Sequence, residues 1–144
     1  MKNQRGVALV EFALVLPFLL LLTFIVTEFG RAMYQYNALT KSVRDATRYL
    51  STQMPGTHVT EAKNLAVYGN LTGSGTPLVP GLTIAKVQDP TWQTVSGTPT
   101  INTVRITISG YTFQPLFSGA FGATFFGGES ITFSPISATM RTYL

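Results

Sequence analysis

The stretch that decides the fold is V-A-L-V-E-F-A-L-V-L-P-F-L-L-L-L-T-F-I-V-T, residues 7–27 of a chain of 144 residues. Twenty helical residues span about 30 Å, which is the thickness of the hydrocarbon layer of a bilayer. This run therefore predicts a transmembrane helix over residues 7–28. About 115 residues remain outside it, enough for one modest core.

Two residues interrupt the apolar run. A carboxylate such as Glu11 is costly near lipid and usually has a partner or faces a cavity, unless it lies among hydrated headgroups. Pro17 removes one backbone donor, and its ring clashes with the carbonyl of Ala13, so we expect a kink or a short melted turn. Neighbouring helices can satisfy the released carbonyl, or the kink is tolerated without a function.

The residues at the start of the run leave more than one interpretation open. A secretory signal peptide would use Lys2 and Arg5 as its positive region. However, its apolar part is normally about 7–15 residues and carries no carboxylate. An ordinary single-pass anchor explains the length of the run but not Glu11. The third interpretation is that Gly6, four apolar residues and then Glu11 and Phe12 resemble a type IV prepilin processing signal, which a membrane peptidase cuts after the glycine.

Cleavage after Gly6 would make Val7 the first residue of the mature chain and Glu11 the fifth. The new α-amino group of Val7 is largely protonated at neutral pH. In a filament it can lie against Glu11 of a neighbouring subunit, so that two charges that are each costly alone offset one another. Because a misplaced subunit leaves both charges unpaired, the pair would act on the register of assembly, together with Phe12 and Pro17.

The helical pattern continues beyond the membrane. Gly30 is the only breaker before Pro55-Gly56, and apolar residues recur three and four apart, which is one face of a helix. We therefore expect an extracytoplasmic amphipathic helix over residues 29–53. Its apolar seam, through which it packs on the rest of the chain, consists of Phe29, Met33, Tyr36, Leu39, Val43, Ala46 and Leu50.

Several short motifs gather in residues 5–50. They are R-G-V-A-L-V-E-F-A-L-V-L-P-F-L-L-L-L from Arg5, E-F-G-R-A at 28–32, Tyr36, N-A-L-T at 37–40 and A-T-R-Y at 46–49. Together they resemble the TadE-like family, pseudopilin-type proteins of the tight-adherence (Tad, Flp-type) pilus systems. Phe12 stands where the major Flp pilins usually have Tyr, which favours an accessory subunit or minor pilin.

The resemblance implies a single-pass protein of the bacterial inner membrane, with its N-terminus in the cytoplasm and its C-terminal domain outside. It implies that residues 1–6 form a leader that a prepilin peptidase removes. It also implies as partners other pilin or pseudopilin subunits, membrane lipid and the inner-membrane assembly platform. A count of basic residues near the helix, two before it and four within about 20 residues after it, points to the opposite orientation.

Residues 54–144 predict a small α+β domain. A short helix is expected at 60–68, capped by Thr60 and ended by Gly69-Asn70. Strands are expected at 82–87, at 101–109 with a continuation through Tyr111 and Phe113, at 131–133 and at 136–143. We expect three or four antiparallel strands on the helical seam, a pilin-like α+β plan.

A segment rich in Phe and Gly, residues 116–128, has two interpretations. It covers one end of the sheet, or it contacts the membrane surface or another subunit. The residues expected at such a partner contact are Phe117, Phe121, Phe125 and Phe126.

Catalytic and ligand-binding patterns are missing from the sequence. It has no Cys and a single histidine, His58, so it offers neither a metal cluster nor a Ser-His-Asp triad. We expect no catalytic residue, no metal and no cofactor, and therefore no enzyme. The net charge of +4 is not gathered into a basic stripe, which argues against nucleic acid as a partner. The alternative to a pilus subunit is a membrane-tethered binding or adhesion module that is not built into a filament.

Overall fold

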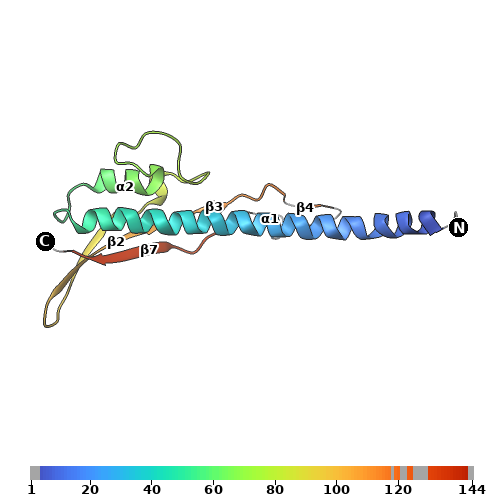
Figure 1. The fold of residues 1–144 in the computed structure, drawn as a ribbon. Helices are drawn as coiled ribbons and strands as arrows, with labels where there is room; N and C mark the ends of the chain where they lie inside the picture. Colours follow the sequence, from blue (N-terminus) through green and yellow to red (C-terminus); the bar gives the residue numbers. More distant parts are fainter. Residues whose placement is uncertain (1–3, 118, 121–122, 125–129, 143–144) are drawn as a thin grey trace. The chain divides into compact units, whose positions relative to one another are not determined.

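The computed structural model describes residues 4–117, 119–120, 123–124, 130–142 (Figure 1). It has a long helix, α1 (Gln4–Ser51), a short helix, α2 (Val59–Tyr68), and one turn of 3₁₀-helix, η1 (Ile84–Lys86). The strands come later in the chain and pair in antiparallel fashion. The expected α+β class, with a long apolar N-terminal helix followed by small antiparallel sheets, is therefore confirmed.

The chain divides into two compact units. The first unit comprises Met1–Met33 and Gln114–Ile131, and the second comprises Tyr34–Phe113 and Thr132–Leu144. Helix α1 therefore contributes residues to both units, and each unit also draws on residues much later in the sequence. We describe each unit by itself.

The main sheet of the second unit has the strand order β1-β2-β7. Strand β1 (Thr91–Val95) pairs with β2 (Ile101–Ile108), with Trp92 opposite Val104. Strand β2 also pairs with β7 (Ile136–Arg141), with Val104 opposite Met140. Two further pairs are very short: β3 (Thr112–Phe113) with β6 (Ile131–Thr132), and β4 (Gly119–Ala120) with β5 (Ala123–Thr124).

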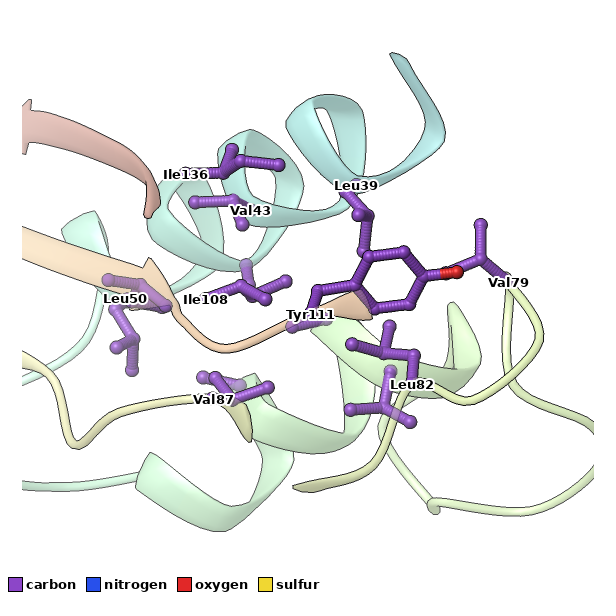
Figure 2. Close-up of a cluster of buried hydrophobic side chains, with 14 of the residues drawn as sticks. Leu39, Val43, Leu50, Val79, Leu82, Val87, Ile108, Tyr111 and Ile136 are labelled. Atoms are coloured by element: carbon purple, nitrogen blue, oxygen red, sulfur yellow. The ribbon is translucent and has the colours of Figure 1, made fainter. Parts of the chain in front are cut away.

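The core of the second unit forms where α1, α2 and the sheet meet. Val104, Ile106 and Ile108 alternate along β2 and are all buried, as the sequence pattern predicts for one face of a strand. Figure 2 shows how side chains from the helix, the strands and the loop before β1 converge. The residues labelled there are Leu39, Val43, Leu50, Val79, Leu82, Val87, Ile108, Tyr111 and Ile136.

Three details of the expected fold are wrong. Residues 82–87 do not form a strand, because the chain turns through η1 and only Val87 bridges to the sheet, opposite Ile108. Helix α2 begins at Val59, one residue before the expected cap, and its N-terminal flank is His58 in the left-handed conformation with no side-chain cap. The continuation of β2 is interrupted at Gly110, whose φ of 67° bends the chain away from an extended strand.

Strand β1 was not among the strands expected from the sequence. Four of its five residues are exposed and Trp92 is partly exposed, so the strand carries no apolar alternation. It forms because β2 offers an unpaired edge, and backbone pairing there needs no apolar pattern. The C-terminal end of α2 agrees with the expectation, because Gly69 adopts a φ of 74° and its N–H donates to the Leu65 carbonyl.

Candidate functional site

The surface of α1 in the first unit is apolar on every side. Among the described residues, α1 is the one helix long and apolar enough to cross a membrane, and none of its most apolar window is buried. The exposed large apolar side chains include Val7, Leu9, Val10, Phe12, Leu14, Val15, Leu16, Phe18, Leu19, Leu22, Ile25 and Val26. A helix that is apolar all round is stable only in lipid or covered by other protein. It supports single-pass anchoring in a membrane.

Two threonine hydroxyls lie within or at the end of this apolar run, and both are satisfied inside the helix. The Thr23 hydroxyl donates to the Leu19 carbonyl at 2.8 Å, and the Thr27 hydroxyl donates to the Thr23 carbonyl at 2.8 Å. A hydroxyl bonded to the carbonyl four residues earlier presents little polarity outward. These two residues therefore do not oppose insertion of the helix into lipid.

Glu11 is the exception on this surface. It is exposed, and within the described part of the chain no side chain offers its carboxylate an ion pair or a hydrogen bond. Gly6 lies on the same helix with open space around it, since a Cβ there would meet no atom within 4 Å. The fold therefore leaves both the expected cleavage position before Val7 and the carboxylate of Glu11 accessible to other molecules.

Pro17 lies inside α1, and the helix continues on both sides of it. Of the two alternatives expected there, a kink or a short melted turn, the melted turn is not found, because the residues around Pro17 keep helical conformation. Proline removes a single backbone donor, and the hydrogen bonds of the turns before and after it hold the helix together.

The seam residues of α1 divide into two groups. Leu39, Val43, Ala46 and Leu50 are fully buried in the core of the second unit. Phe29, Met33 and Tyr36 stay 59%, 44% and 43% exposed, although the Tyr36 ring meets Phe133 edge-on at 5.7 Å. The C-terminal half of the seam is thus occupied by the chain's own core, and the N-terminal half remains available.

A buried carboxylate lies just beyond the apolar run. Glu28 is fully buried, and Nη1 of Arg31 donates to both of its carboxylate oxygens, at 2.9 and 2.7 Å. The backbone N–H of Leu116 donates to Oε2 of Glu28 at 3.2 Å. We call this group, Glu28, Arg31 and the Leu116 N–H, the Glu28 clasp. A buried charge is tolerated only with such partners, so the clasp fixes residue 116 on the helix.

The Glu28 clasp was not foreseen from the sequence. Glu28 was noted there only within the motif E-F-G-R-A. The signal that could have found half of it is a Glu and an Arg three residues apart at the end of an apolar run, since residues at that spacing meet on a helix. The other half comes from a residue 88 positions away in sequence, which no local pattern indicates.

Only one residue of the expected Phe-rich contact is described. Phe117 is 41% exposed and stacks on Phe24, with ring centroids 4.7 Å apart and an interplanar angle of 19°. Leu116 beside it is 72% exposed. The other three expected residues, Phe121, Phe125 and Phe126, lie outside the described residues.

The second unit carries two open grooves without catalytic chemistry. One, of about 400 Å³, is lined by Tyr34, Asn37, Ala38, Lys41, Ser42 and Leu78. The other, of about 540 Å³, is lined by Arg48, Ser51, Thr52, Met140 and Arg141. Neither lining contains a carboxylate or a histidine to serve as a general base. In the part of the chain that the structure describes, no group of three or more His, Cys, Asp or Glu side chains is placed to hold a metal ion.

Within the described residues, the helices and sheets define a protein with one candidate membrane anchor and small antiparallel sheets, an α+β class. Residues 6–48 match the family model described as TadE-like protein. This match confirms the resemblance indicated by the sequence motifs, over the N-terminal third of the chain, and it associates the protein with Tad pilus systems. No curated protein and no solved structure matches the chain.

Proposed function

We propose that this protein is a pseudopilin or minor pilin-like structural subunit of a Tad/Flp pilus system. In this role it has no enzymatic activity of its own. It is held in the bacterial inner membrane by α1, with the N-terminus in the cytoplasm and the sheet-containing unit outside. A prepilin peptidase removes residues 1–6. The subunit then assembles with other pilin or pseudopilin subunits at the inner-membrane platform.

One observation carries this proposal. The exposed apolar run of α1, residues 7–27, lies within the TadE-like segment and carries the carboxylate of Glu11, which has no partner among the described residues, five residues after an accessible Gly6. A plain anchor gains nothing from a carboxylate in that position, because an unpaired charge opposes insertion. A filament subunit gains a partner for it, the α-ammonium group of Val7 on a neighbouring subunit. The Glu11 carboxylate thus favours assembly over simple tethering.

The intact mass of the protein from its native membrane tests the proposal. We expect a mature chain that begins at Val7. A chain that retains Met1–Gly6 in cells with an active prepilin peptidase would contradict processing. It would leave the protein as a membrane-tethered binding or adhesion module.

A second experiment tests the orientation independently of processing. The chain contains no Cys, so a cysteine introduced at the exposed Val95 is a unique site for a membrane-impermeant thiol reagent. We expect labelling of this cysteine in spheroplasts, where the periplasmic face is accessible. Labelling only after lysis would place the second unit in the cytoplasm and contradict the proposed topology.

A further inference from the structure

Leu116 and Phe117 lie against α1 near the end of its apolar run. Leu116 is held through its N–H by Glu28, and the Phe117 ring stacks on Phe24. Phe24, Glu28 and Arg31 are four and three residues apart, so they lie on one face of the helix. Phe24 is three residues before Thr27, or about 4–5 Å along the axis at 1.5 Å per residue. The later segment thus reaches back to the helix at the level of the last turn of the apolar run.

The Glu28 clasp makes this placement specific. The carboxylate of Glu28 is removed from solvent, and its neighbours are a guanidinium and a backbone N–H. If Leu116 moved away, the Glu28 carboxylate would lose the Leu116 N–H as a donor and would become exposed to solvent or lipid. Leaving a buried charged group without a partner is costly, so the clasp holds the backbone of residue 116 in place.

The side chains held at this position point to an apolar environment. Leu116 is 72% exposed and Phe117 is 41% exposed, although the backbone beside them is firmly bonded. In the same turns of α1, Ile25, Val26 and Phe29 are 42%, 63% and 59% exposed. Exposed apolar surface costs about 25 cal/mol per Å² in water, and Phe24, on which Phe117 stacks, lies within the apolar run of the candidate membrane span.

We propose that Leu116 and Phe117 form a second membrane contact, in which both side chains enter the outer edge of the bilayer that holds α1. Glu28 and Arg31 are the positioning residues of this contact. We assign lipid as the partner of Leu116 and Phe117. Their contact with α1 begins at Phe24, within the apolar run, and the side chains of that run face lipid when the chain is anchored. The inference rests on the membrane anchoring proposed above, and the experiment separates the two.

The test uses the full chain reconstituted in phosphatidylcholine vesicles. A nitroxide label is attached to Leu116→Cys, which is unique because the sequence has no Cys. Its collision rates with oxygen, which concentrates in lipid, and with a water-soluble nickel complex are then compared. Leu22→Cys, at an exposed position of α1, is the lipid reference, and Val95→Cys, on β1, is the water reference.

We expect the nitroxide at residue 116 to collide more often with oxygen than with the nickel complex, as the nitroxide at residue 22 does. A label at 116 that favours the nickel complex, as at 95, while the label at 22 favours oxygen, overturns the second contact and leaves the anchor standing. A label at 22 that favours the nickel complex overturns the anchoring itself. The label at 116 could instead be protected from both reagents and lose this protection when labelled chains are diluted with unlabelled ones. That result identifies a contact between copies of the chain and also overturns the proposal.

Variants of the clasp test the positioning role. In the Leu116→Cys chain, Glu28→Ala should reduce the preference for oxygen to the value at residue 95, with the label at 22 unchanged. Glu28→Gln keeps an acceptor for the Leu116 N–H and should retain an intermediate preference. Asp45→Ala, which removes an exposed carboxylate from the same helix, is the matched control and should change nothing. An unchanged label at 116 in Glu28→Ala would show that the clasp does not position it.

Discussion

The Tyr111 hydroxyl lies 2.8 Å from the side-chain amide of Gln35, and the two residues are 76 positions apart in sequence. The same hydroxyl donates to the Pro80 carbonyl, also at 2.8 Å. A hydroxyl has one hydrogen and the carbonyl can only accept, so both contacts are satisfied when the Gln35 amide turns its N–H toward Tyr111. Three segments of the second unit, α1, the loop before η1 and the chain after β2, therefore meet at one hydroxyl.

Tyr111→Phe tests this junction. The substitution leaves Gln35, which is 7% exposed, without its partner, and an unsatisfied buried polar group costs about 1–3 kcal/mol. We expect the free energy of unfolding of the second unit to fall by that amount. Denaturant unfolding in detergent micelles, followed through the fluorescence of Trp92, the only tryptophan, measures it. Tyr34→Phe, at a 72% exposed position, should stay within about 0.5 kcal/mol of the native chain.

Leu50→Ala tests the buried part of the α1 seam. Leu50 is fully buried in the core, and removal of a buried leucine side chain costs about 2–5 kcal/mol through lost apolar burial and the cavity that remains. The same unfolding measurement should show a loss in this range. Leu71→Ala makes the same chemical change at a 43% exposed position and should cost less. Equal losses in the two variants would contradict the assignment of Leu50 to the core.

Glu11→Ala tests the carboxylate on the apolar surface. Removal of a charge from this surface favours insertion, so membrane insertion should remain intact. Assembly should be lost, because the α-ammonium of Val7 in a neighbouring subunit would have no partner. Membrane fractionation and electron microscopy of pili measure the two outcomes. Leu9→Ala, at a position 69% exposed, is the control and should assemble. Normal pili in Glu11→Ala cells would sink the pairing hypothesis.

Gly6→Leu tests the processing position. The helix itself should accept a side chain there, because a Cβ at Gly6 meets no atom within 4 Å. The resemblance to prepilins implies that the peptidase needs glycine before the scissile bond, so the variant should keep residues 1–6. Intact mass measures this. Gly30→Leu has the same open surroundings in the same helix and should be processed normally. Cleavage of Gly6→Leu after residue 6 would contradict this specificity.

The parts of the fold that the sequence predicts are those with a strong period. The helical spacing from Leu39 to Leu50 and the alternation along Val104, Ile106 and Ile108 each bury one face, so local pattern and tertiary contact agree. Strand β1 could not be predicted, because four of its five residues, T-W-Q-T-V, are exposed and only Trp92 packs against the core, so no apolar alternation marks the strand that pairs with β2. Residues 82–87 alternate in sequence, but Ile84 is exposed and Lys86 donates from Nζ to the Gly110 carbonyl, which suits a turn.

The candidate site divides in the same way. Gly6 and Glu11 could be proposed from the sequence, because the processing and pairing they suggest depend on spacing along one helix, and these roles stay predictions. The Glu28 clasp could not, since the residue that completes it lies beyond three strands in sequence and contributes only a backbone N–H. Every residue except proline carries a backbone N–H, so the sequence does not show which N–H will pair with Glu28. The role of Glu28 becomes visible only when the fold brings residue 116 to it.

Under the proposed function, the hydrogen bonds of the Thr23 and Thr27 hydroxyls affect how the chain would move from the bilayer into a filament. Transfer of an apolar side chain from lipid to the apolar flank of another helix changes its surroundings very little. Because both hydroxyls stay bonded within their own helix, they keep the same partners on either side of that transfer. If the subunit is built into a filament as proposed, moving its apolar surface from lipid into the filament should therefore change its free energy little. In that proposal Glu11 favours the filament over the bilayer, because its carboxylate is unpaired in lipid and pairs with the α-ammonium group of Val7 in the filament.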